Sequence, residues 1–275
     1  MGRKLRIGII GCGTIGSYVL DAVQINDVKN AKVAVVCGRT NQSKGKDKVD
    51  EYNIPWITNP DELLDYDLNV VVETASHEAL ADYGPKILRA GIDLIPLSLG
   101  TLVDANVLEE LISEANSGNS ILHVPSGGIG GLDALQAALI AGVDNVTMTT
   151  RKAPVAWKDI PYVEKMNLDL KNMEEPTVLY EGSARHCVKE FPQNINIAAA
   201  LSLAGIGFDK TQIRIIADPH VKYNTHEISW EGKAGRFQMT LENEPVPTNP
   251  RTTYMACLSA VASLNRTRSP YRIGT

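Results

Sequence analysis

The sequence predicts an α/β fold in which a doubly wound parallel sheet is followed by a second α+β domain with a mainly antiparallel sheet. Three observations support this prediction. A glycine-rich turn joins an apolar segment to a helical pattern at residues 11–16. Strand and helix patterns then alternate as far as residue 125, as a parallel sheet with crossover helices requires. Beyond that point strand patterns predominate and follow one another at short range, as antiparallel neighbours do.

The glycine-rich turn is the first element to justify. The apolar run 4–10 enters Gly11-x-Gly13-x-x-Gly16, and the residues that follow repeat at helical spacing. In such a strand–turn–helix unit Gly11 allows the tight turn, Gly13 allows the backbone to approach a pyrophosphate, and Gly16 allows the helix to pack on the strand. The N–H groups of the helix start, including those of Thr14 and Ile15, hold the anion. This pattern is typical of a Rossmann-type dinucleotide site, and the alternative is a glycine turn that binds nothing.

The second strand bears on which dinucleotide is bound. The apolar segment 32–37 ends in Gly38-Arg39-Thr40, where NAD-binding folds carry an acidic residue that accepts hydrogen bonds from the ribose. A guanidinium at this place can pair with a ribose 2′-phosphate. The sequence therefore favours NADP, or the use of both NADP and NAD, with Arg39 and Thr40 as contacts. The alternative is that Arg39 is an ordinary solvated loop residue.

The alternation continues through the rest of the first domain. Two further apolar strands end at turns that contain Ala75 and Ser98, and ligands of open α/β sheets bind beyond the carboxyl ends of the strands. Ala75 and Ser98 are therefore expected cofactor contacts. The remaining elements of this domain are predicted as a short strand at 54–57, strands at 68–76, 93–98 and 120–124, and helices at 78–90 and 104–116.

A glycine cluster at 125–131 marks the passage into the second domain. We expect a dinucleotide-binding domain at 1–125 and a substrate, catalytic and oligomerisation domain at 126–249, with the C-terminal segment 250–275 packing back on the first. The second domain is predicted to hold helices at 132–141 and 194–204 and strands at 145–151, 177–181, 212–217, 225–231 and 236–242, before a last helix at 250–265.

Composition excludes several classes of function. The net charge is −5, so the chain lacks the basic footprint that nucleic-acid binding needs. No stretch reaches the roughly 20 apolar residues of a membrane helix, and the expected location is the cytoplasm. The four cysteines are scattered, without metal-ligand spacing, so no metal is expected.

Candidate chemistry lies in the second domain. The segment 191–200 carries two amides, Asn194 and Asn196, at the start of a predicted helix. His220 and His226 lie near the turn between two strands, and histidine is the side chain best suited to exchange a proton with an amine near neutral pH. Pattern alone does not separate catalytic histidines from surface ones here.

At these residues the chain resembles the L-aspartate dehydrogenase family. The resemblance covers nearly the whole chain and rests on these blocks: GCGTIG at 11–16, LSLGTLVD at 97–104, PSGGIGGLDAL at 125–135, FPQNINIAAAL at 191–201, NTHEI at 224–228 and NPRTT at 249–253. It implies NAD(P)-dependent interconversion of L-aspartate and iminosuccinate, or oxaloacetate plus ammonia, which can supply NAD synthesis. It also implies a homo-oligomer, expected to be a dimer.

The resemblance implies roles for individual residues. The family's catalytic histidine falls on His226, and its cofactor-contacting asparagine falls on Asn194 or Asn196. Gly128 occupies a position close to the nicotinamide. The two substrate carboxylates need cations or helix-start N–H groups. The candidates for substrate binding are Arg151, Lys152, Arg185 and His220.

Two other functions remain open at this point. One is a dehydrogenase or reductase that acts on another small amino acid or dicarboxylate, because fold does not decide the substrate. The other is a non-catalytic NADP(H) sensor. A sensor has no reason to keep Asn194, Asn196 and His226 in its second half.

Overall fold

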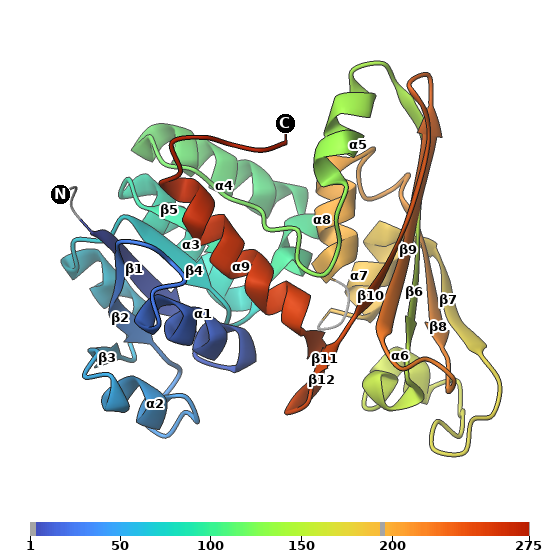
Figure 1. The fold of residues 1–275 in the computed structure, drawn as a ribbon, viewed down its shortest axis with the longest axis horizontal. Coiled ribbons are helices and arrows are strands. Elements are labelled where there is room, and N and C mark those ends of the chain that lie inside the picture. The colour runs from blue at the N-terminus through green and yellow to red at the C-terminus, as the bar shows by residue number, and fades with distance from the viewer. Residues whose placement is uncertain (1–3, 193–195, 275) are drawn as a thin grey trace. The chain divides into compact units, whose positions relative to one another are not determined.

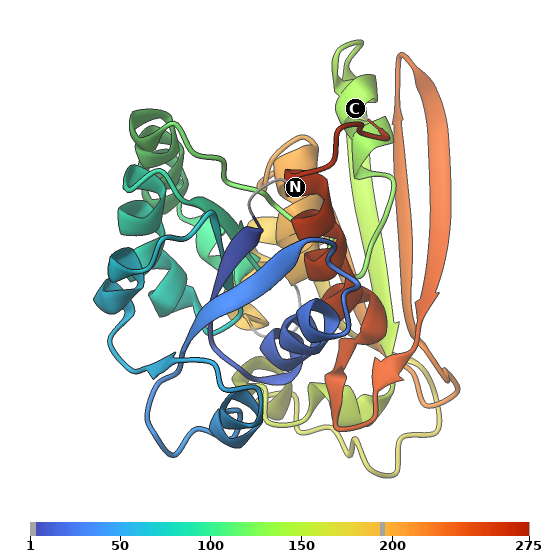
Figure 2. The same ribbon diagram turned by 60° about the vertical axis from the view of Figure 1, so that its left-hand side comes forward.

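The computed structural model describes residues 4–192 and 196–274 (Figures 1 and 2). The chain forms two compact units. The first comprises the residues up to Pro125 together with Ala256–Arg272, and the second comprises Ser126–Met255 together with the end of the chain.

The first unit contains a parallel five-stranded sheet in the order β3-β2-β1-β4-β5. The order reverses between β1 and β4, which is where open α/β sheets bind their ligands. This architecture confirms the predicted fold class. The strands are β1 (Leu5–Ile10), β2 (Ala31–Cys37), β3 (Trp56–Ile57), β4 (Val70–Glu73) and β5 (Asp93–Pro96).

Helices cover this sheet because its strands are apolar on both faces, as the full burial of the adjacent Val71 and Val72 of β4 shows. They are α1 (Thr14–Gln24), α2 (Lys46–Glu51), α3 (His77–Arg89), α4 (Ala105–Gly118) and the 3₁₀ turns η1 (Pro60–Asp65) and η2 (Leu99–Val103).

Helix α9 (Tyr254–Thr267) returns to the first unit from the far end of the sequence. It lies beside α1 in Figures 1 and 2, and its Ala260, Val261 and Leu264 belong to the core cluster that includes Leu20 of α1. The helix starts later than predicted. Residues 249–253 form strand β12 (Asn249–Thr253), which pairs with β11 (Pro245–Val246), so the helix begins only at Tyr254.

The second unit contains a mixed sheet in the order β10-β9-β6-β8-β7. All neighbours are antiparallel except β6 and β8, which confirms the expected, mainly antiparallel sheet. The strands are β6 (Val143–Lys152), β7 (Thr177–Ser183), β8 (Gln212–Ala217), β9 (Asn224–Gly232) and β10 (Gly235–Asn243). The helices are α5 (Leu132–Leu139), α6 (Pro161–Glu164), α7 (Ala184–Glu190), α8 (Asn196–Ala204) and the 3₁₀ turn η3 (Pro154–Trp157).

Side chains alternate between the two faces of this sheet with the strand period of two. Thr150 and Lys152 of β6 are buried, as are His226 and Trp230 of β9. Figure 1 shows α5 and α8 along one side of the sheet. The intervening positions are more exposed and polar; there, Thr147 and Ser229 share a hydrogen bond of 2.7 Å.

One further local prediction is wrong, and one helix was not predicted. Residues 120–124 do not form a strand, because they meet β5 only at the single bridge between Leu94 and Leu122. His123, in this segment, is half-buried, and its Nε2 lies 3.2 Å from Oδ2 of Asp93. Helix α7 went unpredicted because its pattern is short, and short helices carry little periodic signal.

Candidate functional site

A cavity of about 630 Å³ opens in the first unit at the carboxyl ends of β1, β2 and β4. Its position at the reversal of strand order is the one expected for a dinucleotide. Its walls come from the glycine turn, the loop after β2 and the start of α3. They include Gly11, Gly13, Arg39, Thr40, Ser43, Lys44, Ala75, Ser76 and Ala79.

The three glycines of the turn serve different physical needs. Gly11 has φ +83°, and a β-carbon there would lie 2.9 Å from the Cα of Ala75. A β-carbon on Gly16 would lie 2.2 Å from the carbonyl oxygen of Gly11, so α1 packs directly on the turn. A β-carbon on Gly13 would meet nothing within 4 Å. Packing therefore explains Gly11 and Gly16, whereas Gly13 leaves open space beside the helix start, which fits a pyrophosphate.

The loop after β2 gives the cavity a positive wall. Arg39 and Lys44 line it, together with the hydroxyl-bearing Thr40 and Ser43. The backbone N–H of Thr40 donates to Oγ of Ser43 at 3.2 Å, which holds the loop in a tight turn. None of the described residues that line the cavity is acidic.

Several expected cofactor residues lie elsewhere in the structure. Thr14, Ile15 and Gly16 stand at the start of α1 but are not among the residues lining the cavity. Ser98 also lies outside it, because its hydroxyl donates to the buried carboxylate of Glu73 at 3.0 Å. Asn194 lies outside the described residues.

His226 is the centre of a buried polar cluster in the second unit. It is 2% exposed, and its Nδ1 lies 3.1 Å from Oγ1 of Thr150 on the neighbouring strand β6. Burial, and then the nearby Lys152 ammonium, lower the pKa of His226 to about 3. The imidazole is therefore neutral near pH 7 and is a weak base in this state.

Lys152 lies two residues beyond Thr150 on the same face of β6. It is 3% exposed, and its Nζ lies 5.2 Å from the centre of the Trp157 ring. Burial, and then the charge of Arg251, lower the pKa of Lys152 to about 8. The ammonium form thus predominates at pH 7, and a buried cation favours an anionic partner.

Gly128 joins this cluster from the glycine segment before α5. Its carbonyl oxygen accepts a hydrogen bond of 2.6 Å from Nδ2 of Asn243. A β-carbon on Gly128 would lie 3.0 Å from that same nitrogen and 3.8 Å from Nε2 of His226. Because Gly128 has no side chain, it leaves space beside Nε2 of His226, the ring nitrogen that does not contact Thr150.

Asn243 was missed by sequence reasoning, although strand pairing could have indicated it. Asn243 is paired across β9 and β10 with Asn224, and Leu241 is paired with His226. Asn224 and His226 are two positions apart on β9. With period two, Asn243 falls on the same face as His226.

Other predicted substrate residues are engaged elsewhere. Nε and Nη2 of Arg185 donate to the two carboxylate oxygens of Asp209 at 2.6 and 3.0 Å. Arg151 lies on the opposite face of β6, between Asp218 at 3.7 Å and Glu227 at 3.5 Å. His220 is exposed. The structure therefore groups Lys152 with His226 and leaves these three outside the cluster. Asn196 begins helix α8 and is half-buried.

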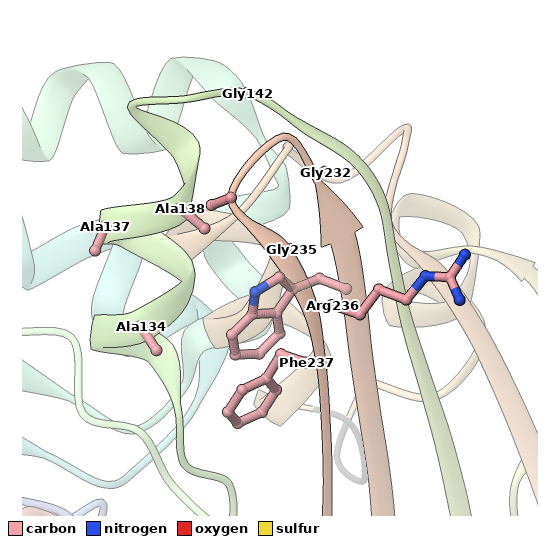
Figure 3. A pocket seen from close by; sticks show the side chains of 10 residues that line it. Ala134, Ala137, Ala138, Gly142, Gly232, Gly235, Arg236 and Phe237 are labelled. Atoms are coloured by element: carbon pink, nitrogen blue, oxygen red, sulfur yellow. The ribbon is translucent and has the colours of Figure 1, made fainter.

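A second cavity in this unit, of about 390 Å³, lies between α5 and the β9–β10 hairpin (Figure 3). Small residues of α5 face the rings of Trp230 and Phe237, which stack with their centres 3.8 Å apart. Arg236, the one titratable residue in its described lining, pairs with Glu231 at 3.2 Å. This cavity offers no acid or base for catalysis.

The described residues contain no helix long and apolar enough to cross a membrane. They also contain no group of three metal-ligating side chains placed to share an ion.

Comparison with known proteins gives consistent matches along the chain. Residues 133–267 match the family described as aspartate dehydrogenase, C-terminal, and residues 11–125 match the NAD-binding domain of homoserine dehydrogenase. L-aspartate dehydrogenase from Methanosarcina mazei is 40% identical, over 98% of this chain and 100% of that protein. The enzyme of that name from Ralstonia pickettii is 36% identical, over 94% and 96%.

Solved structures agree with these matches. The crystal structure of aspartate dehydrogenase from Thermotoga maritima is 26% identical, with a TM-score of 0.75, over 99% of this chain and 100% of that one. A homoserine dehydrogenase from Thiobacillus denitrificans, at 12% identity and a TM-score of 0.63, shares the fold alone.

Proposed function

Because this chain belongs to the L-aspartate dehydrogenase family, and is thus an amino-acid dehydrogenase that acts on a CH–NH₂ donor, we propose that its substrate is L-aspartate. It oxidises L-aspartate to iminosuccinate, which hydrolyses to oxaloacetate and ammonia, or catalyses the reverse reductive amination. The observation that carries this proposal is the buried pair of a neutral imidazole, His226, and a buried ammonium, Lys152, on one face of the second sheet.

A pyridine dinucleotide fits the cavity of the first unit, where Gly13 leaves room for the pyrophosphate and the N–H groups of α1 begin. When bound, it supplies the hydride acceptor for the oxidation. The protein's own contribution is to hold the dinucleotide, orient the substrate and move a proton.

His226 serves as the acid–base group. In the tautomer whose Nδ1–H donates to Oγ1 of Thr150, Nε2 is the nitrogen that accepts a proton from the substrate ammonium or from the water that hydrolyses the imine. The low pKa of His226 follows from burial beside Lys152. A dicarboxylate bound to Lys152 opposes this positive field, so the basicity of His226 rises when the substrate arrives.

Lys152 serves as a partner for a substrate carboxylate. Its charge is buried, and a buried cation is stabilised by an anionic partner, which a substrate carboxylate supplies. Lys152 accounts for one of the two carboxylates of L-aspartate.

The cofactor proposal is NADP, with NAD as a second cofactor. Arg39 and Lys44 supply two cations beside the hydroxyls of Thr40 and Ser43, a set suited to a 2′-phosphate. The acidic ribose partner typical of NAD sites is absent from the described lining.

We also propose a homodimer and a role in supplying iminosuccinate for NAD synthesis, both on the strength of the family resemblance. Light scattering on the purified protein tests the dimer.

A substrate panel tests the proposed function. Nicotinamide absorbance is followed with L-aspartate, L-glutamate, L-alanine and L-homoserine, and with oxaloacetate plus ammonia, each with NADP and with NAD. We expect turnover with L-aspartate and with oxaloacetate plus ammonia, and a lower KM for NADP than for NAD. Activity confined to another amino acid would overturn the substrate assignment.

A further inference from the structure

The carboxylate of Glu73 is buried at the end of β4, next to the cavity of the first unit. Glu73 is 1% exposed and is the last residue of its strand, paired with Ile10 of β1 and Pro96 of β5. It therefore stands at the carboxyl edge of the sheet, beside the reversal of strand order. The proposed chemistry makes no use of it.

Four donors converge on this carboxylate. Oε1 accepts hydrogen bonds from the backbone N–H of Ala75 at 2.7 Å, from that of Ser76 at 3.0 Å and from the hydroxyl of Ser98 at 3.0 Å. Oε2 accepts from the backbone N–H of Ser98 at 3.2 Å. Burial raises the pKa of Glu73, while these hydrogen bonds act in the opposite direction. A site with four hydrogen-bond donors is well matched by a carboxylate, which has two acceptor oxygens and no hydrogen to donate.

The donors come from two loops that are separate in the sequence. Ala75 and Ser76 follow β4, whereas Ser98 follows β5. A single side chain thus ties both loops to the edge of the sheet. The backbone directly after β5 reinforces the link, because the N–H of Leu97 donates to the carbonyl oxygen of Glu73 at 2.8 Å.

The loop after β4 forms part of the cavity wall. Ala75 and Ser76 line the cavity, and Ser76 caps α3 by accepting a hydrogen bond of 3.2 Å from the N–H of Ala79, which also lines it. Ala75 lies so close to the glycine turn that a β-carbon on Gly11 would come within 2.9 Å of it. A small shift of Ala75 would therefore either collide with the turn or widen the cavity.

From these contacts we infer that Glu73 is a positioning residue for dinucleotide binding, which holds the loop 74–77 against the glycine turn through the N–H groups of Ala75 and Ser76. The inference rests on the proposed placement of the dinucleotide in this cavity. Glu73 acts through the loop and takes no part in the chemical step.

Substitution of Glu73 by glutamine tests this role. The amide has the same shape but only one acceptor, so its NH₂ group must face either the N–H of Ser98 or the three donors now bound to Oε1. We expect a rise of about tenfold or more in the KM and Kd for the dinucleotide, since a buried donor loses its acceptor next to the binding wall. The kcat at saturating dinucleotide and the KM for L-aspartate should stay within about twofold, a split that general destabilisation would not produce.

Two matched variants accompany this one. Ser98→Ala removes one donor and keeps the carboxylate, so we expect a smaller rise in the KM for the dinucleotide. If Glu73→Gln does not fold, Ser98→Ala tests the role of Glu73 in its place. Glu109→Gln changes an exposed carboxylate of α4 in the same unit and should leave all constants unchanged.

Gly13→Ala separates this inference from the proposed placement of the cofactor. If Gly13→Ala raises the dinucleotide KM and a folded Glu73→Gln enzyme does not, the placement stands and the role of Glu73 is refuted. If neither variant changes it, the placement itself is wrong and the inference falls with it.

Discussion

His226 and Lys152 show how burial, and then a neighbouring cation, lower the pKa of two basic side chains. In water, Lys152 would be charged and His226 would have its ordinary pKa. In the structure, both side chains are almost fully buried on one face of the sheet. Burial disfavours the charged form of a base, and each cation next to another disfavours it further. The result is a neutral imidazole beside an ammonium, a pair suited to accept a proton and hold an anion.

Replacement of His226 by alanine should abolish most turnover while leaving dinucleotide affinity intact. The expected fall in kcat is about 100-fold or more, as for the loss of a general acid–base group. Steady-state kinetics and dinucleotide titration measure the two effects. The control is His186→Ala, which removes an exposed histidine that lies 3.6 Å from Glu190. Near-normal kcat in the His226 variant would remove this residue from the mechanism.

Lys152 should impose a pH dependence on substrate binding. Its pKa of about 8 means that the ammonium is present at pH 7 and is lost as the pH rises through 8. The KM for L-aspartate should therefore increase between pH 7 and pH 9. In Lys152→Met the KM should be high at pH 7 and vary little over this range. If the variant kept the wild-type profile, another group would be responsible for it.

At the scale of the element, the strand–turn–helix unit at residues 5–24 combines a fold requirement with a binding requirement. Gly16 is needed because α1 packs on the carbonyl oxygen of Gly11, and Gly11 is needed for its positive φ. Neither requirement applies to Gly13. Its φ of −81° is accessible to residues with a side chain, and a β-carbon placed there would meet nothing within 4 Å.

Alanine substitutions at Gly13 and Gly16 should separate these two demands. Gly13→Ala should leave the Tm almost unchanged and weaken dinucleotide binding by about tenfold, because the methyl group occupies the space that a pyrophosphate needs. Gly16→Ala should lower the Tm, because its methyl group meets backbone at 2.2 Å. Thermal unfolding without dinucleotide, together with dinucleotide titration, measures both. Equal effects of the two variants on Tm would contradict this division.

At the scale of the whole molecule, the two ends of the chain build one core. Helix α9 contributes Ala260, Val261 and Leu264 to the cluster that also holds Leu5 and Ile7 of β1. The first unit is therefore incomplete until residues after the second unit have folded.

Leu264→Ala should thus destabilise the first unit although it lies near the chain's end. Leu264 is fully buried, and truncation of such a leucine costs about 2–5 kcal/mol of unfolding free energy. Leu258→Ala, on the same helix at 51% exposure, should cost less than about 0.5 kcal/mol. Denaturant unfolding of both variants provides the comparison, and similar losses would show that α9 does not depend on this packing.

Local rules in the sequence were sufficient for the five strands of the first unit's sheet and for the glycine turn. His226 came from the family resemblance and Lys152 was one of several candidate cations, and both stay predictions. Strands with apolar character, glycines at fixed spacing and blocks typical of the family can be recognised without knowledge of contacts. Local rules failed at residues 120–124 and 249–253. There, strand formation depends on a partner strand, which the sequence does not specify.

The sequence by itself determined the fold class, the dinucleotide turn and the resemblance to the dehydrogenase family, because these depend on periodicity and on short spacings along the chain. Only the tertiary structure decided that Lys152 accompanies His226 while Arg185 pairs with Asp209, that Asn243 binds Gly128, and that Ser98 donates to Glu73. The physical reason is that hydrogen bonds and burial act between residues distant in the chain. Such pairs meet only when strand order and register are fixed.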